Sequence, residues 1–293
     1  MKKILLMLSA LAICFASCQK VGTENSENAE NTENTEDNEE EEGTELPEDE
    51  IIHFDDPIFL NALLSRDVDT NHDGQISVSE ANSVKKLYLN TCGISDISEI
   101  RYFTALAELS CLENLFTSLD VSDNTALTLL ICHYNQLTSL DVSGNTTLSY
   151  LSCAYNQLTT LDVSNNTALT ELYCQNNHLS TLDVSNNTGL EILICGSNQL
   201  EALDVSNNTA LSELYCEYNQ QTSLDVSNCP YLTILYCENN QLTSLDVSNN
   251  TALVRLSCYD NPLQTLTISQ SQENASWLDD VRQQYPDIEI IVK

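Results

Sequence analysis

The stretch LTLLICHYNQL, residues 127–137, sets the frame of this chain. The frame L-x-x-L-x-C-x-x-N-x-L returns every 21 residues and is followed by a nearly constant TSLDVSNNTA segment. A fixed period on this scale predicts a solenoid, in which each coil contacts its neighbours and the stack buries one continuous core. The cysteines of the frame are Cys111, Cys132, Cys153, Cys174, Cys195, Cys216, Cys237 and Cys258.

Alternation within the frame predicts which side chains face the core. The segment around each L-x-C is expected to be a short strand, so that Leu130 and Cys132 point inward while Ile131 points outward. Strands stacked at about 4.8 Å per coil build one parallel sheet. Asn135 and its equivalents are expected to bond backbone groups where the chain turns, as a buried asparagine ladder.

This frame resembles the leucine-rich repeat family, with cysteine where that family usually has a third leucine. The resemblance covers residues 84–268 and implies an α/β solenoid, curved, with 21-residue coils and a parallel concave sheet. It also implies a binding function without naming the ligand. Regular repeats start at Leu106, Leu127, Leu148, Leu169, Leu190, Leu211 and Leu232, and an eighth at Leu253 degrades after Ile268. A divergent first repeat spans residues 84–105.

Charge excludes two classes of partner. The chain has 44 Asp+Glu against 10 Lys+Arg, a formal net charge of -34. Between Leu106 and Cys258 the only basic residue is Arg255. Nucleic acids and anionic membrane surfaces bind clustered Lys and Arg, so neither is an expected partner.

The N-terminal residues have the features of a lipoprotein signal, assigned here to residues 1–17. Lys2 and Lys3 precede an apolar run, and FASC, residues 15–18, resembles the bacterial lipobox, which implies a lipid on Cys18. An ordinary cleaved signal with a chance cysteine is the alternative. Residues 18–50 are expected to be a disordered acidic tether. Acidic residues near the lipidated cysteine resemble the surface-export signal of Bacteroidetes lipoproteins, so we expect an exported protein anchored at the outer membrane or cell surface.

Residues 69–80, DTNHDGQISVSE, match the twelve-residue EF-hand loop at every diagnostic position. A single structural Ca²⁺ is therefore expected, with a metal-free Asp/Asn-rich turn as the alternative. The ligands would be the side chains of Asp69, Asn71 and Asp73, the carbonyl of Gln75, Ser77 through water, and Glu80 in bidentate fashion.

Both ends of the solenoid are expected to be capped. Residues 51–83 predict a helical cap, with a first helix starting at Asp56-Pro57 and a second opened by Ser77-x-x-Glu80. A single EF-hand-like cap joined to leucine-rich repeats resembles the arrangement of internalins, and we expect calcium to stabilise it. The repeats end at residue 269, and residues 270–293 predict a helix over 274–284 and a final strand.

The cysteines themselves are expected to be buried, free thiols. Each replaces a core leucine and faces the same way as its neighbours, which suits neither disulfide geometry nor a tetrahedral metal site. Cys132 and His133 are adjacent on a strand, so they face opposite sides and cannot form a catalytic dyad. No enzymatic activity and no catalytic residue are predicted.

The aspartate of each DVS segment also recurs once per coil. A calcium-binding β-roll is one interpretation; the favoured one is that each aspartate accepts backbone N–H groups in a tight turn. The aspartates are Asp120, Asp141, Asp162, Asp183, Asp204, Asp225 and Asp246.

Residues near each cysteine vary from coil to coil, whereas the DVS side hardly varies. The variable positions, interpreted as outward strand positions, are rich in tyrosine, which gives large contact area with few rotors. We expect the concave sheet to bind a protein of a host or bacterial surface. Carbohydrate binding in a glycan-uptake system is the alternative, and tyrosines that stack only for stability are a further one. The expected binding surface comprises Tyr134, Tyr150, Tyr155, Tyr173, Ile194, Tyr215, Tyr218, Tyr236 and Tyr259.

Overall fold

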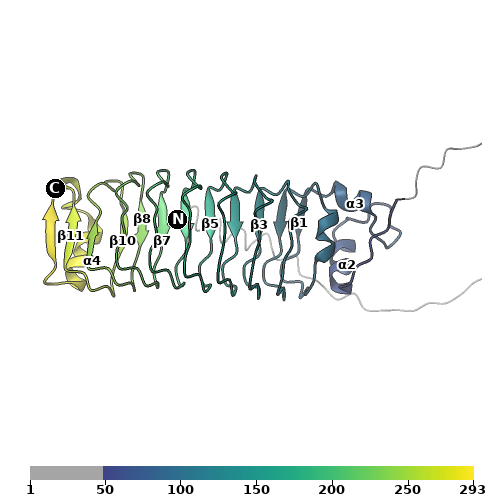
Figure 1. Cartoon of the computed structure of the whole chain (residues 1–293), viewed down its shortest axis with the longest axis horizontal. Coiled ribbons are helices and arrows are strands. Elements are labelled where there is room, and N and C mark those ends of the chain that lie inside the picture. The colour runs from purple at the N-terminus through teal and green to yellow at the C-terminus, as the bar shows by residue number, and fades with distance from the viewer. Residues whose placement is uncertain (1–48) are drawn as a thin grey trace, which may run out of the picture.

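The computed structural model describes residues 49–293. Figure 1 shows one elongated stack of coils, with two short helices, α2 and α3, at one end and α4 with β11 at the other. The predicted signal peptide, the lipidated Cys18 and nearly all of the tether lie outside the described residues. Within residues 49–293, no helix is long and apolar enough to cross a membrane.

The coils are joined by a parallel sheet of nine strands, in the order β1-β2-β3-β4-β5-β6-β7-β8-β10. Each strand is three residues long, and its central leucine pairs with the central leucine of the next strand, as in Leu130↔Leu151. These leucines are buried while their strand neighbours are mostly half-buried, which confirms the predicted alternation. The strands are Lys86–Tyr88 (β1), Glu108–Ser110 (β2), Leu129–Ile131 (β3), Tyr150–Ser152 (β4), Glu171–Tyr173 (β5), Ile192–Ile194 (β6), Glu213–Tyr215 (β7), Ile234–Tyr236 (β8) and Arg255–Ser257 (β10).

The cysteine ladder lies in the core, as predicted. All eight of its thiols are free and buried. Burial raises the pKa of Cys111 and of Cys153 to about 12, so these thiols stay protonated and pack as small apolar groups.

The predicted asparagine ladder is also present. In a typical coil, Asn198 Nδ2 donates to Cys174 O at 3.1 Å and Cys195 O at 3.0 Å. Its Oδ1 accepts from the backbone N–H of Leu179 at 3.0 Å. At the last coil the Tyr285 hydroxyl, 2.8 Å from Cys258 O, closes the row. In Asn198, both the nitrogen and the oxygen of the side-chain amide therefore have hydrogen-bond partners.

A second asparagine ladder, which we did not predict, runs through the SNNT turns. Asn187 Nδ2, for example, donates to Val163 O at 3.0 Å and Asn166 O at 2.9 Å, but its Oδ1 is buried without a partner. Cys229 replaces asparagine in one coil, and Gln272 Nε2 ends the row. The other asparagines of this ladder are Asn124, Asn145, Asn166, Asn208 and Asn250.

The N-terminal cap consists of α2 (Pro57–Leu64) and α3 (Val78–Ser83), followed by a 3-10 helix (Ser98–Tyr102). Asp56 caps α2 through the N–H of Ile58 and also accepts from Ser95 N–H at 2.9 Å, which ties the cap to the first repeat. Ser77 and Glu80 form the predicted capping box of α3.

The C-terminal cap differs in detail from the prediction. Helix α4 covers Ser276–Gln284, and Trp277 Nε1 donates to Leu253 O at 3.3 Å. A second parallel sheet, in the order β12-β11-β9, joins Glu289–Val292, Thr265–Ile268 and Ser244–Asp246. The final strand is therefore formed, but Ile291 and Val292 remain 40% and 44% exposed, because β12 pairs on one side with β11 only.

Candidate binding surface

We call the outward side of the nine-stranded sheet the strand face. Its tyrosines contact one another across coils: the ring centroids of Tyr150 and Tyr173 lie 5.2 Å apart, and those of Tyr215 and Tyr236 lie 5.0 Å apart in an edge-to-face arrangement. Each contact of this kind contributes about 0.5–1.5 kcal/mol beyond area burial. The strand face therefore contains packed aromatic pairs, which support the stability interpretation in part.

A hydrogen bond holds the ring of Tyr173 in place. The Tyr173 hydroxyl donates to Glu171 Oε2 at 2.7 Å, and Tyr173 is only 6% exposed. Burial and this bond raise the pKa of Tyr173, while burial raises the pKa of Tyr150 and of Tyr215 to about 12. All three hydroxyls are neutral donors at physiological pH.

Four of the tyrosines interpreted as strand residues lie outside the strands, contrary to our interpretation of the sequence: Tyr134, Tyr155, Tyr218 and Tyr259. Tyr134, Tyr155 and Tyr218, which we call the turn tyrosines, follow the strands and have φ of 56°, 52° and 53°. The strands end one residue before each ladder cysteine, and the second residue after it takes the left-handed conformation in which the chain turns. Asn176 and Asn239 occupy the same position in other coils, with φ of 55° and 54°.

The turn tyrosines are among the exposed aromatic groups of this side. Tyr134 and Tyr218 are 49% and 51% exposed, and Tyr134 stacks on Tyr155 with centroids 4.2 Å apart. Tyr259, one residue after its ladder cysteine, is 39% exposed. Large exposed aromatic area beside packed aromatic pairs is typical of interaction surfaces.

The residue directly after each ladder cysteine forms a row along the edge of the strand face. In three successive coils this row reads Gly196, Glu217, Glu238. Burial, and then the charge of Glu238, raise the pKa of Glu217. His133 is in the same row; burial lowers its pKa to about 4, and its Nδ1 lies 2.9 Å from Ser152 Oγ, so it is a neutral ring without a thiol partner.

A cleft of about 770 Å³ lies where the strand face meets α4. Side chains of the last coils and of the helix form its wall, among them Tyr236, Glu238, Arg255, Tyr259, Trp277 and Asp280. This cleft was not predictable from the sequence, because it depends on how α4 packs against β10.

The predicted calcium loop has the internal bonds that order such loops. Gly74 N–H donates to Asp69 Oδ2 at 2.9 Å, Asp73 N–H to Asn71 Oδ1 at 2.9 Å, and Gln75 N–H to Asp73 Oδ1 at 2.8 Å. Asp69 Oδ1 is buried without a partner. That orphaned oxygen and the chemistry of the donor set fit a calcium ion.

The carboxylate of Glu80 is hydrogen-bonded to the protein and is not oriented like that of a calcium ligand. Its Oε1 accepts from Thr70 N–H at 2.7 Å and its Oε2 from Ser77 N–H at 2.9 Å. Among residues 49–293 there is no group of three or more His, Cys, Asp or Glu side chains that could hold a metal. The loop scaffold is thus formed, with Glu80 hydrogen-bonded to the loop and the first turn of α3.

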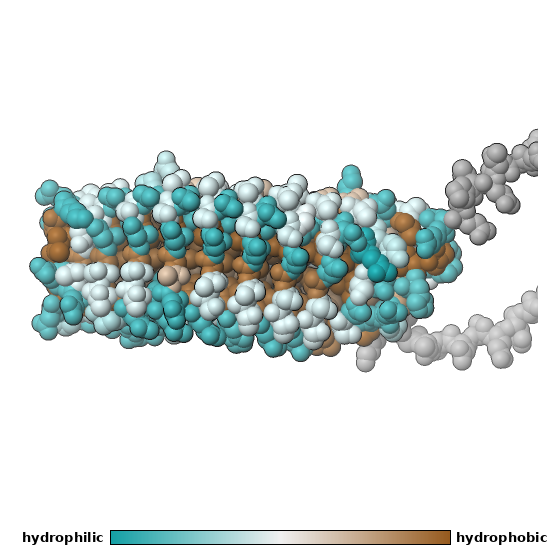
Figure 2. Space-filling view, in the orientation of Figure 1, coloured by the Kyte–Doolittle hydropathy of each residue, from teal (hydrophilic) through white to brown (hydrophobic). Residues whose placement is uncertain are grey.

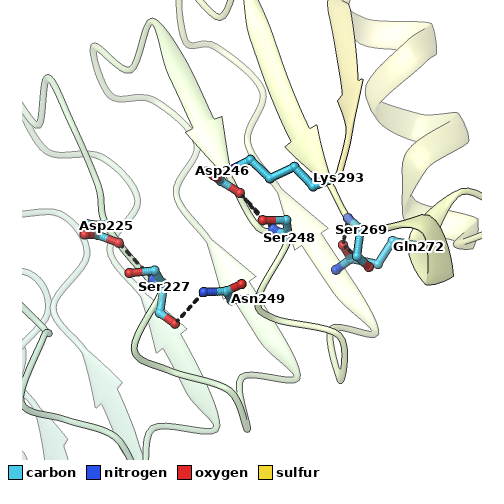
Figure 3. Close-up of polar contacts among 8 residues, drawn as sticks. All are labelled: Asp225, Ser227, Asp246, Ser248, Asn249, Ser269, Gln272 and Lys293. Carbon is cyan, nitrogen blue, oxygen red and sulfur yellow. Dashed lines mark hydrogen bonds and ion pairs between the residues drawn. The ribbon is translucent and has the colours of Figure 1, made fainter.

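The DVS aspartates have the structural role that the sequence favoured. The Oδ1 of Asp225 accepts from the N–H of Ser227, and that of Asp246 from the N–H of Ser248, each at 2.9 Å (Figure 3). Lys293 forms an ion pair with Asp246 at 2.6 Å beside the last of these contacts. Figure 2 shows the regular rows that repeated residues make along the solenoid, with one hydrophobic stripe between more polar rows.

Comparison with known proteins identifies the fold. A family model described as the LVIVD repeat matches residues 135–174, and no curated protein matches the chain. The functional domain of InlJ from Listeria monocytogenes, which includes a cysteine ladder, is 33% identical with a TM-score of 0.56, over 75% of this chain and 55% of that one.

Two further solved structures share the architecture. A leucine-rich repeat protein of Leptospira interrogans is 24% identical with a TM-score of 0.60, over 73% of this chain and 62% of that one. Internalin C2 of Listeria monocytogenes is 19% identical with a TM-score of 0.59, over 82% of this chain and 94% of that one. The predicted leucine-rich repeat solenoid is therefore confirmed, and internalin-like proteins are among its structural neighbours.

Proposed function

We propose that this leucine-rich repeat chain is a binding protein, not an enzyme, and that it recognises a protein partner through the strand face and the turn tyrosines. The observation that carries the proposal is the contrast between two sides of each coil. The DVS side repeats the same bonded residues, whereas the strand side varies and holds exposed tyrosines of 40–51% beside packed aromatic pairs. Protein interfaces are enriched in tyrosine, because this side chain gives a large contact area with few rotors.

The test is a capture experiment with matched variants. The immobilised protein is presented with arrays of host extracellular proteins, bacterial surface proteins and glycans. One variant carries Tyr134→Asn, Tyr155→Asn and Tyr218→Asn, which the chain tolerates at Asn176 and Asn239.

The control variant places three asparagines in the same coils on the other side, at exposed Thr138, Thr159 and Thr222. We expect the tyrosine variant to lose capture of a protein by at least about 10-fold and the control to keep it. Equal capture by both variants would contradict the proposal, and tyrosine-dependent capture of glycans alone would favour the carbohydrate alternative.

We also propose that the loop of residues 69–80 holds one structural Ca²⁺. Asp69, Asn71, Asp73, Gln75, Ser77 and Glu80 would hold the ion, which would supply positive charge to the buried, unpartnered Asp69 Oδ1. Calorimetric titration with CaCl₂ should show one site that Asp69→Asn weakens by at least about 10-fold. Titration without any binding would refute the proposal.

The N-terminal sequence supports export and a lipid on Cys18, at the outer membrane or cell surface. If so, Cys18→Ala moves the protein from the membrane fraction to the soluble fraction of fractionated cells. Unchanged fractionation would contradict the anchor.

A further inference from the structure

Two glutamates on the edge of the strand face, the buried Glu238 and the half-buried Glu217, each have a buried carboxylate oxygen without a cation. Glu238 is 6% exposed, and its Oε2 has no hydrogen-bond partner; Glu217 Oε2 is likewise buried and unpartnered. The ion pairs of residues 49–293 include neither of them. A buried charge with no counter-charge is destabilising, and such groups concentrate at functional sites.

The two glutamates belong to adjacent coils and influence each other. The backbone N–H of Tyr218, next to Glu217, donates to the carbonyl of Glu238 at 2.9 Å. The charge of Glu238 is also the main reason that the pKa of Tyr259 rises to about 12, so that hydroxyl lies close to the carboxylate. Tyr218, the residue after Glu217, and Tyr259, whose hydroxyl lies close to Glu238, are 51% and 39% exposed.

Gly196 makes room for this arrangement. A Cβ added at Gly196 would lie 2.5 Å from Glu217 Oε1, so the carboxylate occupies the space that a side chain would fill in that coil. The preceding coil of the same row has Gln175, an uncharged residue of glutamate's shape. Two acidic residues in successive coils, preceded by a glycine, thus distinguish this part of the row from its other positions.

The cleft beside α4 reaches one member of this pair, Glu238. Glu238 and Tyr259 line it together with Asp280 and Trp277. Arg255, the one basic residue of the lining, is the first residue of β10, whereas Glu238 and Tyr259 follow the last residues of their strands. Glu238 and Arg255 are therefore attached at opposite ends of their strands.

We propose that Glu217 and Glu238, with the cleft beside them, receive a lysine or arginine side chain of the protein partner. This inference rests on the proposed function and names the chemistry of the partner. A basic side chain supplies the missing counter-charge, and the rings of Tyr218 and Tyr259 provide cation–π contact. The net charge of -34 favours the approach of a basic surface. A divalent metal fits less well, because two carboxylates fall short of the six to eight oxygens that calcium takes.

The test uses a defined probe and does not require the natural partner. The peptide acetyl-Gly-Lys-Gly-Lys-Gly-amide and its twin acetylated on both lysines are titrated into the isotope-labelled protein, and backbone amide shifts are followed by NMR. We expect the lysine peptide to shift the amides of Glu217, Tyr218 and Glu238, and the acetylated twin to bind at least 10-fold more weakly.

The matched variants are Glu217→Gln with Glu238→Gln, which reproduce the residue found at Gln175, and Glu171→Gln as the control. Glu171 lies on the same face but already accepts from the Tyr173 hydroxyl at 2.7 Å. The double variant should weaken the lysine peptide at least 10-fold, while the control stays within 2-fold. The double variant should also melt at or above the temperature of the parent, because it removes two buried like charges.

Several results would overturn the inference. They are equal binding of the acetylated twin, unchanged binding to the double variant, and the same amide shifts produced by CaCl₂ alone. If the double variant captures a partner that the turn-tyrosine variant loses, the proposed function stands and this inference fails. If both variants capture it like the parent, the proposed function fails first.

Discussion

The two asparagine ladders lead to different expectations for the same substitution of asparagine by cysteine. In the first ladder, Asn198 Oδ1 is the partner of the buried Leu179 N–H, and its Nδ2 donates to Cys174 O and Cys195 O, with a longer bond of 3.4 Å to Gly196 O. Asn198→Cys removes all of these bonds. Leaving a buried N–H unpaired costs about 1–3 kcal/mol and each lost amide–carbonyl bond about 0.5–1.5 kcal/mol. Because a thiol recovers part of this, we expect a loss of about 3 kcal/mol.

In the second ladder the same change should be nearly neutral. Asn208 Nδ2 donates to Val184 O at 3.0 Å and Asn187 O at 2.9 Å, but both carbonyls also accept a backbone N–H. Its Oδ1 is buried without a partner, so Asn208→Cys removes that penalty along with the two bonds. The opposing contributions leave a change within about 1 kcal/mol. The chain itself has Cys229 at this position of the next coil.

Urea denaturation of both variants, followed by circular dichroism and by intrinsic fluorescence, measures the difference. The midpoint should fall clearly for Asn198→Cys and hardly at all for Asn208→Cys, with unchanged slopes. Equal losses in the two variants, or a larger loss for Asn208→Cys, would refute the view that polar satisfaction distinguishes the ladders.

Three further predictions concern a turn tyrosine, a ladder cysteine and the glutamate of the predicted calcium loop. Tyr155→Asn alone should change the melting temperature by less than about 3 °C, because asparagine tolerates the left-handed turn while one stacked contact is lost; a large drop would contradict the turn assignment. Burial raises the pKa of the Cys195 thiol, so this thiol should resist a thiol reagent at pH 8 until the protein unfolds. Mass spectrometry of the labelled peptides measures this, and rapid labelling of the native protein would mean that the ladder is accessible. Although burial opposes it, hydrogen bonds from Ser77 and Thr70 lower the pKa of Glu80 from 4.5 to about 2. Glu80→Gln should therefore lower the free energy of unfolding at neutral pH, and the difference from the parent should disappear as the pH falls from about 4.5 toward about 2. A difference in unfolding free energy that does not vary with pH would contradict this.

The sequence was sufficient to predict the features that depend on periodicity. Because the frame repeats every 21 residues, one strand register determines all the others, so the inward leucines, the cysteine ladder and the asparagine ladder at Asn135 followed directly. The capping box at Ser77 and the helix start at Asp56 were also local signals.

The features that the sequence did not predict depend on conformation or on contacts between distant segments. Tyrosine favours strands, so nothing local placed Tyr155 in a left-handed turn; the asparagines at the equivalent positions, Asn176 and Asn239, were a signal for this turn. The cleft depends on the packing of α4 against the last coils, and the unpaired state of Glu238 depends on what its neighbours fail to offer. The binding site is thus less predictable than the fold, because it lies where the repeats differ.

The most direct test of the central claim is a hydrogen–deuterium exchange footprint of the protein with a captured partner. Binding through the strand side predicts protection of the segments that contain the turn tyrosines and Glu238, while the DVS turns around Asp141 and Asp204 exchange as in the free protein. Protection confined to the DVS turns would contradict the claim that this protein binds through its strand face.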